Sequence, residues 1–307
     1  MKRNVSEDKI AAIETAEELS DLAPVFETES VHEIYFRAKE VWKEAVRHRQ
    51  ETRPEPDGLP GRVVSIDGHD FHVHGVTHAG TEAERQFLKE HVSAFLDRGA
   101  VVYCEQGIRP MYFEGMDAAC EMDDYLWAVD QCKKLEEEPG VDTFEESGFD
   151  TVVEDSGDLT AAFRERAFEL IDAGSSMYGE RFEKTLGDIA AEFLIDHSDL
   201  AVGKSYEAFR LSREASKDPQ LLHELQQYYE RSFLPQPLER EWLRRHDPEL
   251  EILSHARNER MADYAVYHNQ TAEEVHLIVG AAHQPGVLYY LEAYSDGKEP
   301  PEEFELF

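Results

Sequence analysis

The sequence has no long hydrophobic run and little positive charge. No stretch approaches a run of about 18 apolar residues, the length that a membrane-spanning helix needs, so we expect no membrane span. Lys and Arg number 31 among 307 residues, against 66 Asp and Glu, which gives a formal net charge of -35. Phosphate backbones and anionic lipids repel a chain this acidic. The composition therefore excludes nucleic acid and membrane surfaces as partners.

The acidic residues are spread through the whole chain. A solvated acidic shell keeps a protein soluble in concentrated salt, where charges are nearly fully screened. We therefore expect an acidic, halophilic protein; the alternative is a surface built to bind cations. Full stability in dilute buffer, measured by titrating folding against KCl, would remove the reason for this hypothesis.

Cysteine is scarce as well. The three cysteines, Cys104, Cys120 and Cys132, are odd in number and lack metal-type spacing, which is typical of a reduced compartment. The first residues are charged and contain no apolar segment of the secretory type. We therefore expect a cytoplasmic protein. Phosphate-loop, dinucleotide-binding and G-x-S-x-G motifs are missing too, so nucleotide-dependent and serine-hydrolase functions have no support.

The pattern of apolar residues predicts an α/β protein with a mostly parallel central sheet and a large helical portion. Strand, helix and strand alternate in the first half, and this rhythm favours parallel pairing. Helical patterns dominate the second half. The expected strands are 62–66 and 71–76, joined by Asp67-Gly68, and 100–104 and 276–279. The expected helices are Thr81 to Arg98, 110–134, 249–268 and 285–294, with a helical stretch at 159–230 that is broken near Ser198 and at 217–219.

Composition divides the chain into segments. Residues 1–60 read as an N-terminal helical extension that ends in a Pro-rich stretch. Residues 61–296 form the expected α/β domain, with an acidic, Gly-containing insertion at about 136–158. Residues 297–307 form a polar tail.

Three predicted strands end on a polar side chain that could take part in chemistry. The first ends at Gly75 and His78, the second at Glu105, and the last at Gly280 and His283. Ligands bind at the carboxyl ends of parallel strands, because the loops converge there. Glycine lets the backbone turn tightly at each strand exit. Two imidazoles and a carboxylate at one edge suit a divalent metal or acid/base catalysis.

Glu105 follows an apolar run, and a buried carboxylate needs a cation. Arg109 is near in sequence, so one interpretation is a structural ion pair between these two residues.

Four motifs occur one after another along the chain: Gly75-Val-Thr-His78, Glu105 with Arg109, Arg257-Asn-Glu-Arg-Met-Ala262, and Gly280-Ala-Ala-His283 followed by Gln-Pro-Gly286. Taken together, they resemble the motifs of the TraB/PrgY/GumN/TIKI family. These motifs occur in the family's order and extend over residues 68–295. The chain looks like a soluble member of the haloarchaeal type, and residues 61–296 would be its TraB-like domain.

The resemblance implies an EreA/ChaN-like fold and a site that contains His78, Glu105 and His283 as metal ligands. Glu105, Arg109 and Arg257 would be the catalytic residues, and Gly75, Gly280 and His74 would support them. Family members with activity look like metal-dependent peptidases, while others are linked to pheromone shutdown.

Asp70-x-His72-x-His74-Gly75 also looks like the opening motif of metal-dependent amidohydrolases. Two residues apart in a strand, His72 and His74 share a face and could chelate an ion. An amidohydrolase barrel would need six or seven further strands, and this chain is mainly helical after residue 110. The alternative is that both histidines are polar residues of a half-exposed strand.

Two functions therefore stand as hypotheses. The first is a metal-dependent hydrolase of the peptidase type, with Mn, Co or Zn lowering the pKa of an attacking water and with Arg109 or Arg257 stabilising the oxyanion. The second is a protein that binds a peptide, a small molecule or haem in the same pocket without turnover. A scaffold without chemistry is a third interpretation.

Overall fold

The structure is a computed structural model. It describes residues 2–54, 58–77, 79–105, 109–110, 164, 166–174, 179–195, 199, 201–269 and 272–299. The predicted helix at 110–134, the acidic insertion at about 136–158 and His78 lie outside the described residues, apart from Pro110 at the end of a short strand.

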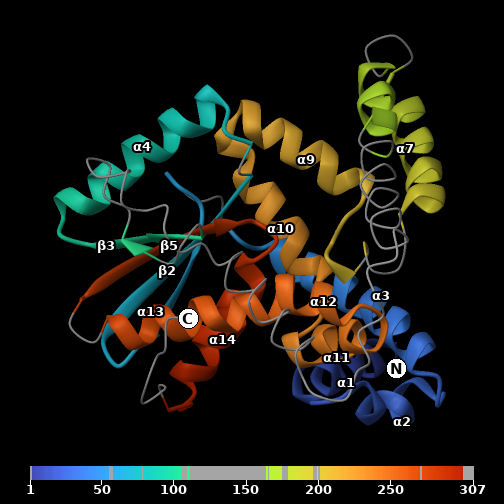
Figure 1. Cartoon of the computed structure of the whole chain (residues 1–307). Helices are drawn as coiled ribbons and strands as arrows, with labels where there is room; N and C mark the ends of the chain where they lie inside the picture. Colours follow the sequence, from blue (N-terminus) through green and yellow to red (C-terminus); the bar gives the residue numbers. More distant parts are fainter. Residues whose placement is uncertain are drawn as a thin grey trace, which may run out of the picture.

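A five-stranded mixed sheet forms the centre of the fold, in the order β1-β2-β5-β3-β4 (Figure 1). Its strands are β1 (Arg62–Ile66), β2 (His69–Val76), β3 (Val101–Cys104), β4 (Arg109–Pro110) and β5 (Glu274–Gly280). The three central strands β2, β5 and β3 are parallel, and the two outer strands pair antiparallel. The prediction of an α/β fold with a mostly parallel centre is confirmed. Among the described strands the sheet is open, which argues against the barrel alternative.

The hairpin that opens the sheet follows from its turn residues. Asp67 and Gly68 both have positive φ, 51° and 88°. A two-residue turn with two such residues matches the right-handed twist of the strands it joins. The predicted hairpin is therefore confirmed, with the second strand beginning at His69.

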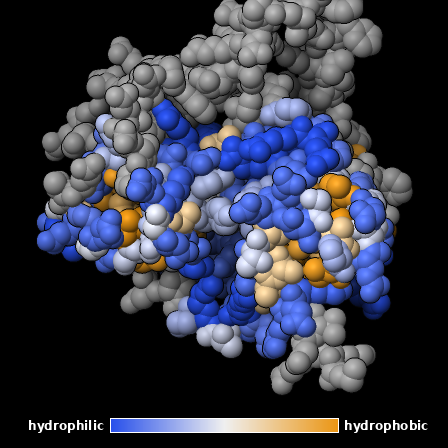
Figure 2. All heavy atoms as spheres, turned by 90° about the horizontal axis from the view of Figure 1, so that it is seen from below, coloured by the Kyte–Doolittle hydropathy of each residue, from blue (hydrophilic) through white to orange (hydrophobic). Residues whose placement is uncertain are grey.

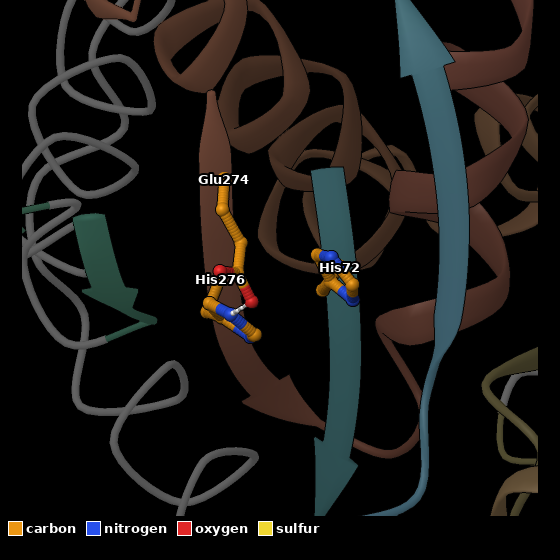
Figure 3. A group of neighbouring side chains, drawn as sticks. All are labelled: His72, Glu274 and His276. Atoms are coloured by element: carbon orange, nitrogen blue, oxygen red, sulfur yellow. Dashed lines mark hydrogen bonds and ion pairs between the residues drawn. The ribbon is translucent and has the colours of Figure 1, made fainter. Parts of the chain in front are cut away.

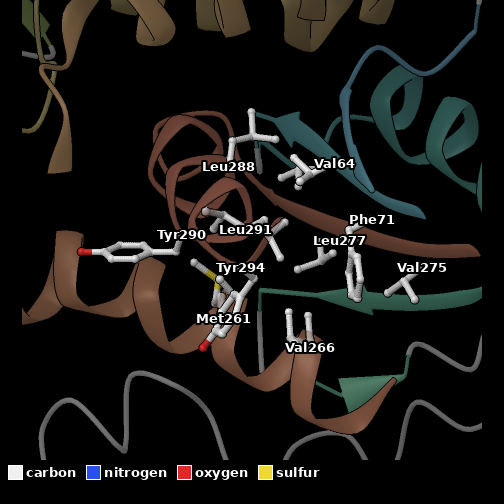
Figure 4. Close-up of a cluster of buried hydrophobic side chains, with 14 of the residues drawn as sticks. Val64, Phe71, Met261, Val266, Val275, Leu277, Leu288, Tyr290, Leu291 and Tyr294 are labelled. Atoms are coloured by element: carbon white, nitrogen blue, oxygen red, sulfur yellow. The ribbon is translucent and has the colours of Figure 1, made fainter. Parts of the chain in front are cut away.

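Side chains that alternate along the strands build two apolar layers, because successive residues of a strand point to opposite faces. On one face, Phe71 and Leu277 pack against α13 (Arg257–His268) and α14 (Gln284–Ser295) (Figure 4). On the other face, Val76, Val102 and Ile278 pack against α4 (Glu82–Asp97), α9 (Tyr206–Lys217) and α10 (Leu222–Ser232). The sheet thus lies between two helical layers.

The predicted cap of the helix after β2 is present. The Thr81 hydroxyl accepts a hydrogen bond from the backbone N–H of Glu84, which satisfies one of the unpaired donors of the first turn of α4. The predicted helix at 249–268 is also present, but it is interrupted. It consists of α12 (Pro248–Glu251), a π-helical turn (Ile252–Ala256) and α13. The π turn directly precedes Arg257.

The N-terminal helices form a separate apolar cluster. They are α1 (Lys2–Thr15), the 3-10 turn η1 (Leu19–Leu22), α2 (Ala23–Phe26) and α3 (Val31–Gln50). Their core is shared with α11 (Gln236–His246), where the Tyr35 ring stacks on Trp242 at 4.2 Å between centroids. The described helices from η1 to α3, with the end of α1 at Ile13, are thus packed on the second half of the chain. The segment boundaries predicted at residues 60 and 296 stay predictions.

The remaining described elements are α7 (Glu180–Leu194) and the 3-10 turn η3 (Pro219–Leu221). No helix in the described part of the chain is long and apolar enough to cross a membrane. On the face shown in Figure 2, hydrophilic side chains cover most of the described surface and hydrophobic ones occur in small groups. This surface agrees with the polar composition.

Candidate functional site

Glu105 lies at the carboxyl end of β3 and is fixed there by the backbone of β5. Its N–H donates to the carbonyl of Ile278 at 2.9 Å, which continues the parallel pairing of the two strands by one residue. Its carboxylate Oε2 accepts from the N–H of Gly280 at 2.6 Å. The residue is only 8% exposed. The carboxylate is therefore held at the edge of the sheet where ligands bind in such folds.

Two further groups converge on the other carboxylate oxygen. Arg257 Nη2 lies 3.3 Å from Glu105 Oε1, and His283 Nε2 lies 3.4 Å from the same atom. Arg257 begins α13 and His283 immediately precedes α14, so two helices and a strand end meet at this point. The guanidinium compensates the buried negative charge.

Asn258 orients the His283 ring. Its Oδ1 lies 2.8 Å from His283 Nδ1. An amide oxygen only accepts, so we assign the ring proton to Nδ1, and the neutral ring then presents the lone pair of Nε2 to the Glu105 side. Nε2 is thereby positioned to bind a cation or to take up a proton.

A buried polar network supports Asn258. Its Nδ2 donates to Gln236 Oε1 at 3.2 Å, and the same oxygen lies 3.0 Å from Nδ1 of His255 in the π turn. Burial lowers the pKa of His255 below its ordinary value. The network joins α11, the π turn and α13 to the site.

Gly286 leaves room for this network. A Cβ built on it would lie 2.0 Å from Asn258 Nδ2 and 2.6 Å from Asn258 Cγ. Any larger residue at position 286 would displace the side chain that orients His283.

Gly75 is required for close approach rather than for a turn. It keeps strand backbone within β2, so the predicted tight turn at this glycine is wrong. A Cβ there would come within 2.9 Å of Ala281 Cα and 3.1 Å of Gln284 Oε1. The missing side chain lets the loop after β5 lie directly on β2, where the Ala281 N–H donates to Val76 O at 2.9 Å. Gly280, the other predicted supporting glycine, contributes the N–H that binds Glu105.

The predicted site residues thus fall into three groups. Glu105, Arg257 and His283 lie together. His78 lies outside the described residues, and of Arg109 only the backbone is described, in β4 beside Cys104. His74 lies in a different place, on the sheet face covered by α4.

His74 lies beside a second cluster, which consists of His72, His276 and Glu274 (Figure 3). Its Nε2 lies 2.9 Å from His276 Nδ1, and His276 Nε2 lies 2.8 Å from Glu274 Oε1. Burial lowers the pKa of His74 to about 3 and that of His276 to about 4. A hydrogen bond from Arg98 is the main cause that lowers the pKa of Glu274 to about 2.

This second cluster could hold a metal ion. One ligand atom from each of His72, Glu274 and His276 lies within 4.8 Å of the others. The expectation that His72 and His74 share a face is confirmed, since their rings lie 6.3 Å apart with an interplanar angle of 8°.

Sequence reasoning missed Asn258, Gln236, Glu274 and His276. The Glu-x-His spacing at 274–276 was a usable signal, because it places both side chains on one face of a strand, as in the His-x-His of 72–74. Nothing local to Gln236 pointed to the site.

Fold and site together define an α/β protein with a charged Glu–Arg–His centre at the carboxyl edge of its parallel strands. No protein-family model, curated protein or solved structure matches this chain.

Proposed function

We propose that this protein is a hydrolase of amide or ester bonds in peptides or small molecules, with Glu105 and His283 as its acid/base pair. The observation that carries the proposal is the convergence of Arg257 and His283 on one oxygen of the buried Glu105 carboxylate. The motifs resemble those of the TraB/PrgY/GumN/TIKI family, and this resemblance implies an EreA/ChaN-like fold. It supports the peptidase class but says nothing about the distances within the site.

The residues divide the chemistry between them. Glu105 is engaged at both oxygens, by Gly280 N–H and by Arg257, and these contacts hold the carboxylate in place. His283 Nε2 lies 3.4 Å from Glu105 Oε1. The His283 ring, held beside the carboxylate, can therefore take a proton from water as the water oxygen attacks the carbonyl carbon. Arg257 then faces the oxyanion that forms. Collapse of the tetrahedral adduct breaks the bond to the amine or alcohol, which leaves with the proton held by His283.

The donor atoms also fit a divalent ion. Glu105 Oε1 and His283 Nε2 are 3.4 Å apart, which is about the separation of two ligands that share one tetrahedral zinc at about 2.0–2.1 Å. Glu105 and His283 would hold the ion, with His78 as the third ligand implied by the family resemblance. A bound Mn, Co or Zn ion would supply an activated water at neutral pH.

The test is hydrolysis of a mixed peptide library and of simple esters by the full-length protein at high KCl, with chelator and with Mn²⁺, Co²⁺ or Zn²⁺. Glu105→Gln and His283→Asn should each lower kcat/KM by about 100-fold or more. His48 and Glu51 provide a matched control, because they form an exposed His–Glu contact of 3.2 Å far along the chain from the site. His48→Asn and Glu51→Gln should leave the rate unchanged.

Two results would contradict the hydrolase. One is turnover that survives both site variants. The other is a ligand that copurifies or binds stoichiometrically without being changed, for example haem with its Soret band, which would support the binding-protein alternative. A third result would decide between the two versions of the mechanism. If the site variants lose turnover but neither chelator nor added metal changes the rate of the original chain, the acid/base pair is supported and the metal ion is not.

A further inference from the structure

The second histidine cluster is built by strand register. His72 of β2 and His276 of β5 are directly opposite each other in the parallel pair, and their ring centroids lie 4.5 Å apart. Glu274 precedes His276 by two residues, so its side chain lies on the same face of the sheet. In Figure 3 the three side chains project from two neighbouring strands toward the same side.

The hydrogen bonds of this cluster require one more positive charge than neutral rings provide. The carbonyl of Pro60 lies 3.0 Å from His74 Nδ1 and can only accept, so that nitrogen donates. His74 Nε2 must then accept from His276 Nδ1, 2.9 Å away. A neutral His276 therefore turns the lone pair of Nε2 toward Glu274 Oε1 at 2.8 Å. Two acceptors at this distance repel each other unless a proton or a metal cation lies between them.

We propose that His72, His276 and Glu274 bind a divalent transition-metal ion of the zinc class on this face of the sheet. Two imidazoles and one glutamate are a known ligand set for zinc, with a fourth position left to water. The arrangement around His276 agrees, because a ligating histidine is normally fixed by a hydrogen bond from its other ring nitrogen. His74, anchored on Pro60, accepts that bond.

A metal explains the cluster better than an extra proton. His276 is 2% exposed and lies against the Phe95 ring at 3.7 Å between centroids, so an imidazolium there would be poorly solvated. Arg98 already donates to Glu274 Oε1 at 2.8 Å from the outside. The ion would therefore bind the nitrogens of His72 and His276 and one oxygen of Glu274. Arg98 is exposed, so its side chain can move away from Glu274 when the ion binds.

This site is separate from the Glu105 site. Glu105 binds the N–H of Gly280, four residues beyond His276 along β5, which corresponds to about 13 Å of strand. The Glu105 side also borders Met261 and Leu277, which belong to the opposite layer. A substitution in one site can therefore abolish ligand binding there without disturbing the other site.

A bound ion would also stabilise the fold. The ligands lie on β2 and β5, about 200 residues apart in sequence, so one ion would tie together two strands that only tertiary folding brings side by side. Metal that binds the folded state alone raises stability with its concentration.

The experiment uses the full-length protein, freed of metal with a chelator and then titrated with Zn²⁺ by calorimetry and with Co²⁺ by visible absorption. His72→Gln and Glu274→Gln should each weaken the metal affinity of this site by about 100-fold, at the upper end of the loss seen when even a supporting residue is removed. They should also abolish the rise in Tm that Zn²⁺ produces. His72 is only partly buried, so its replacement spares the core. His48→Gln, at an exposed histidine, is the matched control and should bind as the original chain does.

A Glu105→Gln/His283→Asn double variant separates this proposal from the proposed function. Metal binding that survives in this variant and disappears with His72→Gln supports the second site. Metal binding that is lost in the double variant and unchanged by His72→Gln overturns it. Absence of any binding to the original chain, with both nitrogens of His276 protonated by nitrogen NMR, also overturns it in favour of the extra proton.

Discussion

Replacing Gly286 with alanine tests whether the network around His283 is as tightly packed as the structure shows. The added Cβ would lie 2.0 Å from Asn258 Nδ2. A normal contact is about 3.5 Å, so the amide must retreat by about 1.5 Å. Retreat breaks its hydrogen bond to His283 or to Gln236, because both are fixed by the present position of the amide.

The change in the free energy of unfolding caused by Gly286→Ala follows from opposing effects. Gly286 lies in the first turn of α14, where alanine favours the helix by up to about 1 kcal/mol. Overpacking a tight site costs about 1–3 kcal/mol, and a lost buried hydrogen bond costs about 1–3 kcal/mol. We therefore expect Gly286→Ala to lower the free energy of unfolding by about 1–5 kcal/mol.

A double-mutant cycle makes the prediction specific. In an Asn258→Ala background the two closest contacts disappear, and of the three nearest contacts the one to Cβ at 2.9 Å remains. The cost of Gly286→Ala should then fall by at least about 1 kcal/mol, and the difference between backgrounds measures the coupling of the two residues. Urea denaturation followed by circular dichroism at fixed KCl gives all four stabilities. Equal costs in both backgrounds would refute the argument that Asn258 is what Gly286 accommodates.

Three other predictions concern α7, the buried His255 and the net charge of the chain. Gly187→Ala should lower the free energy of unfolding by about 1–3 kcal/mol, because the added Cβ would lie 2.2 Å from the Tyr206 ring, where α7 packs on α9. Urea denaturation measures this change, and an unchanged midpoint would contradict the predicted clash. Burial lowers the pKa of His255, so the unfolded chain binds more protons than the folded chain below about pH 6.5, and stability should fall as the pH drops through this range. His255→Gln should flatten this dependence of stability on pH, and an unaltered slope would contradict the role given to His255. Rising KCl should raise Tm, because it screens the repulsion within a chain of net charge -35; a Tm independent of KCl would oppose the halophilic hypothesis.

Much of the fold could be predicted because its signals are local. Asp67-Gly68 predicts a two-residue hairpin turn, Thr81 predicts the start of α4, and alternating apolar residues predict the strands. The position of Glu105 and His283 at strand ends was also predictable, because parallel strands bring their carboxyl ends to one edge. The sequence alone therefore determined the class of the fold and two members of the candidate site.

Only the tertiary structure decided which partners these residues meet. Arg257 reaches Glu105 because the π turn and α13 place it there, and Asn258 orients His283 because Gly286 leaves space for its amide. Likewise, His72 faces His276 only in the observed register of β2 on β5. A shift of one residue would turn one of the two side chains to the opposite face. Register and helix placement depend on packing between segments about 200 residues apart, and no local pattern in the chain encodes that distance.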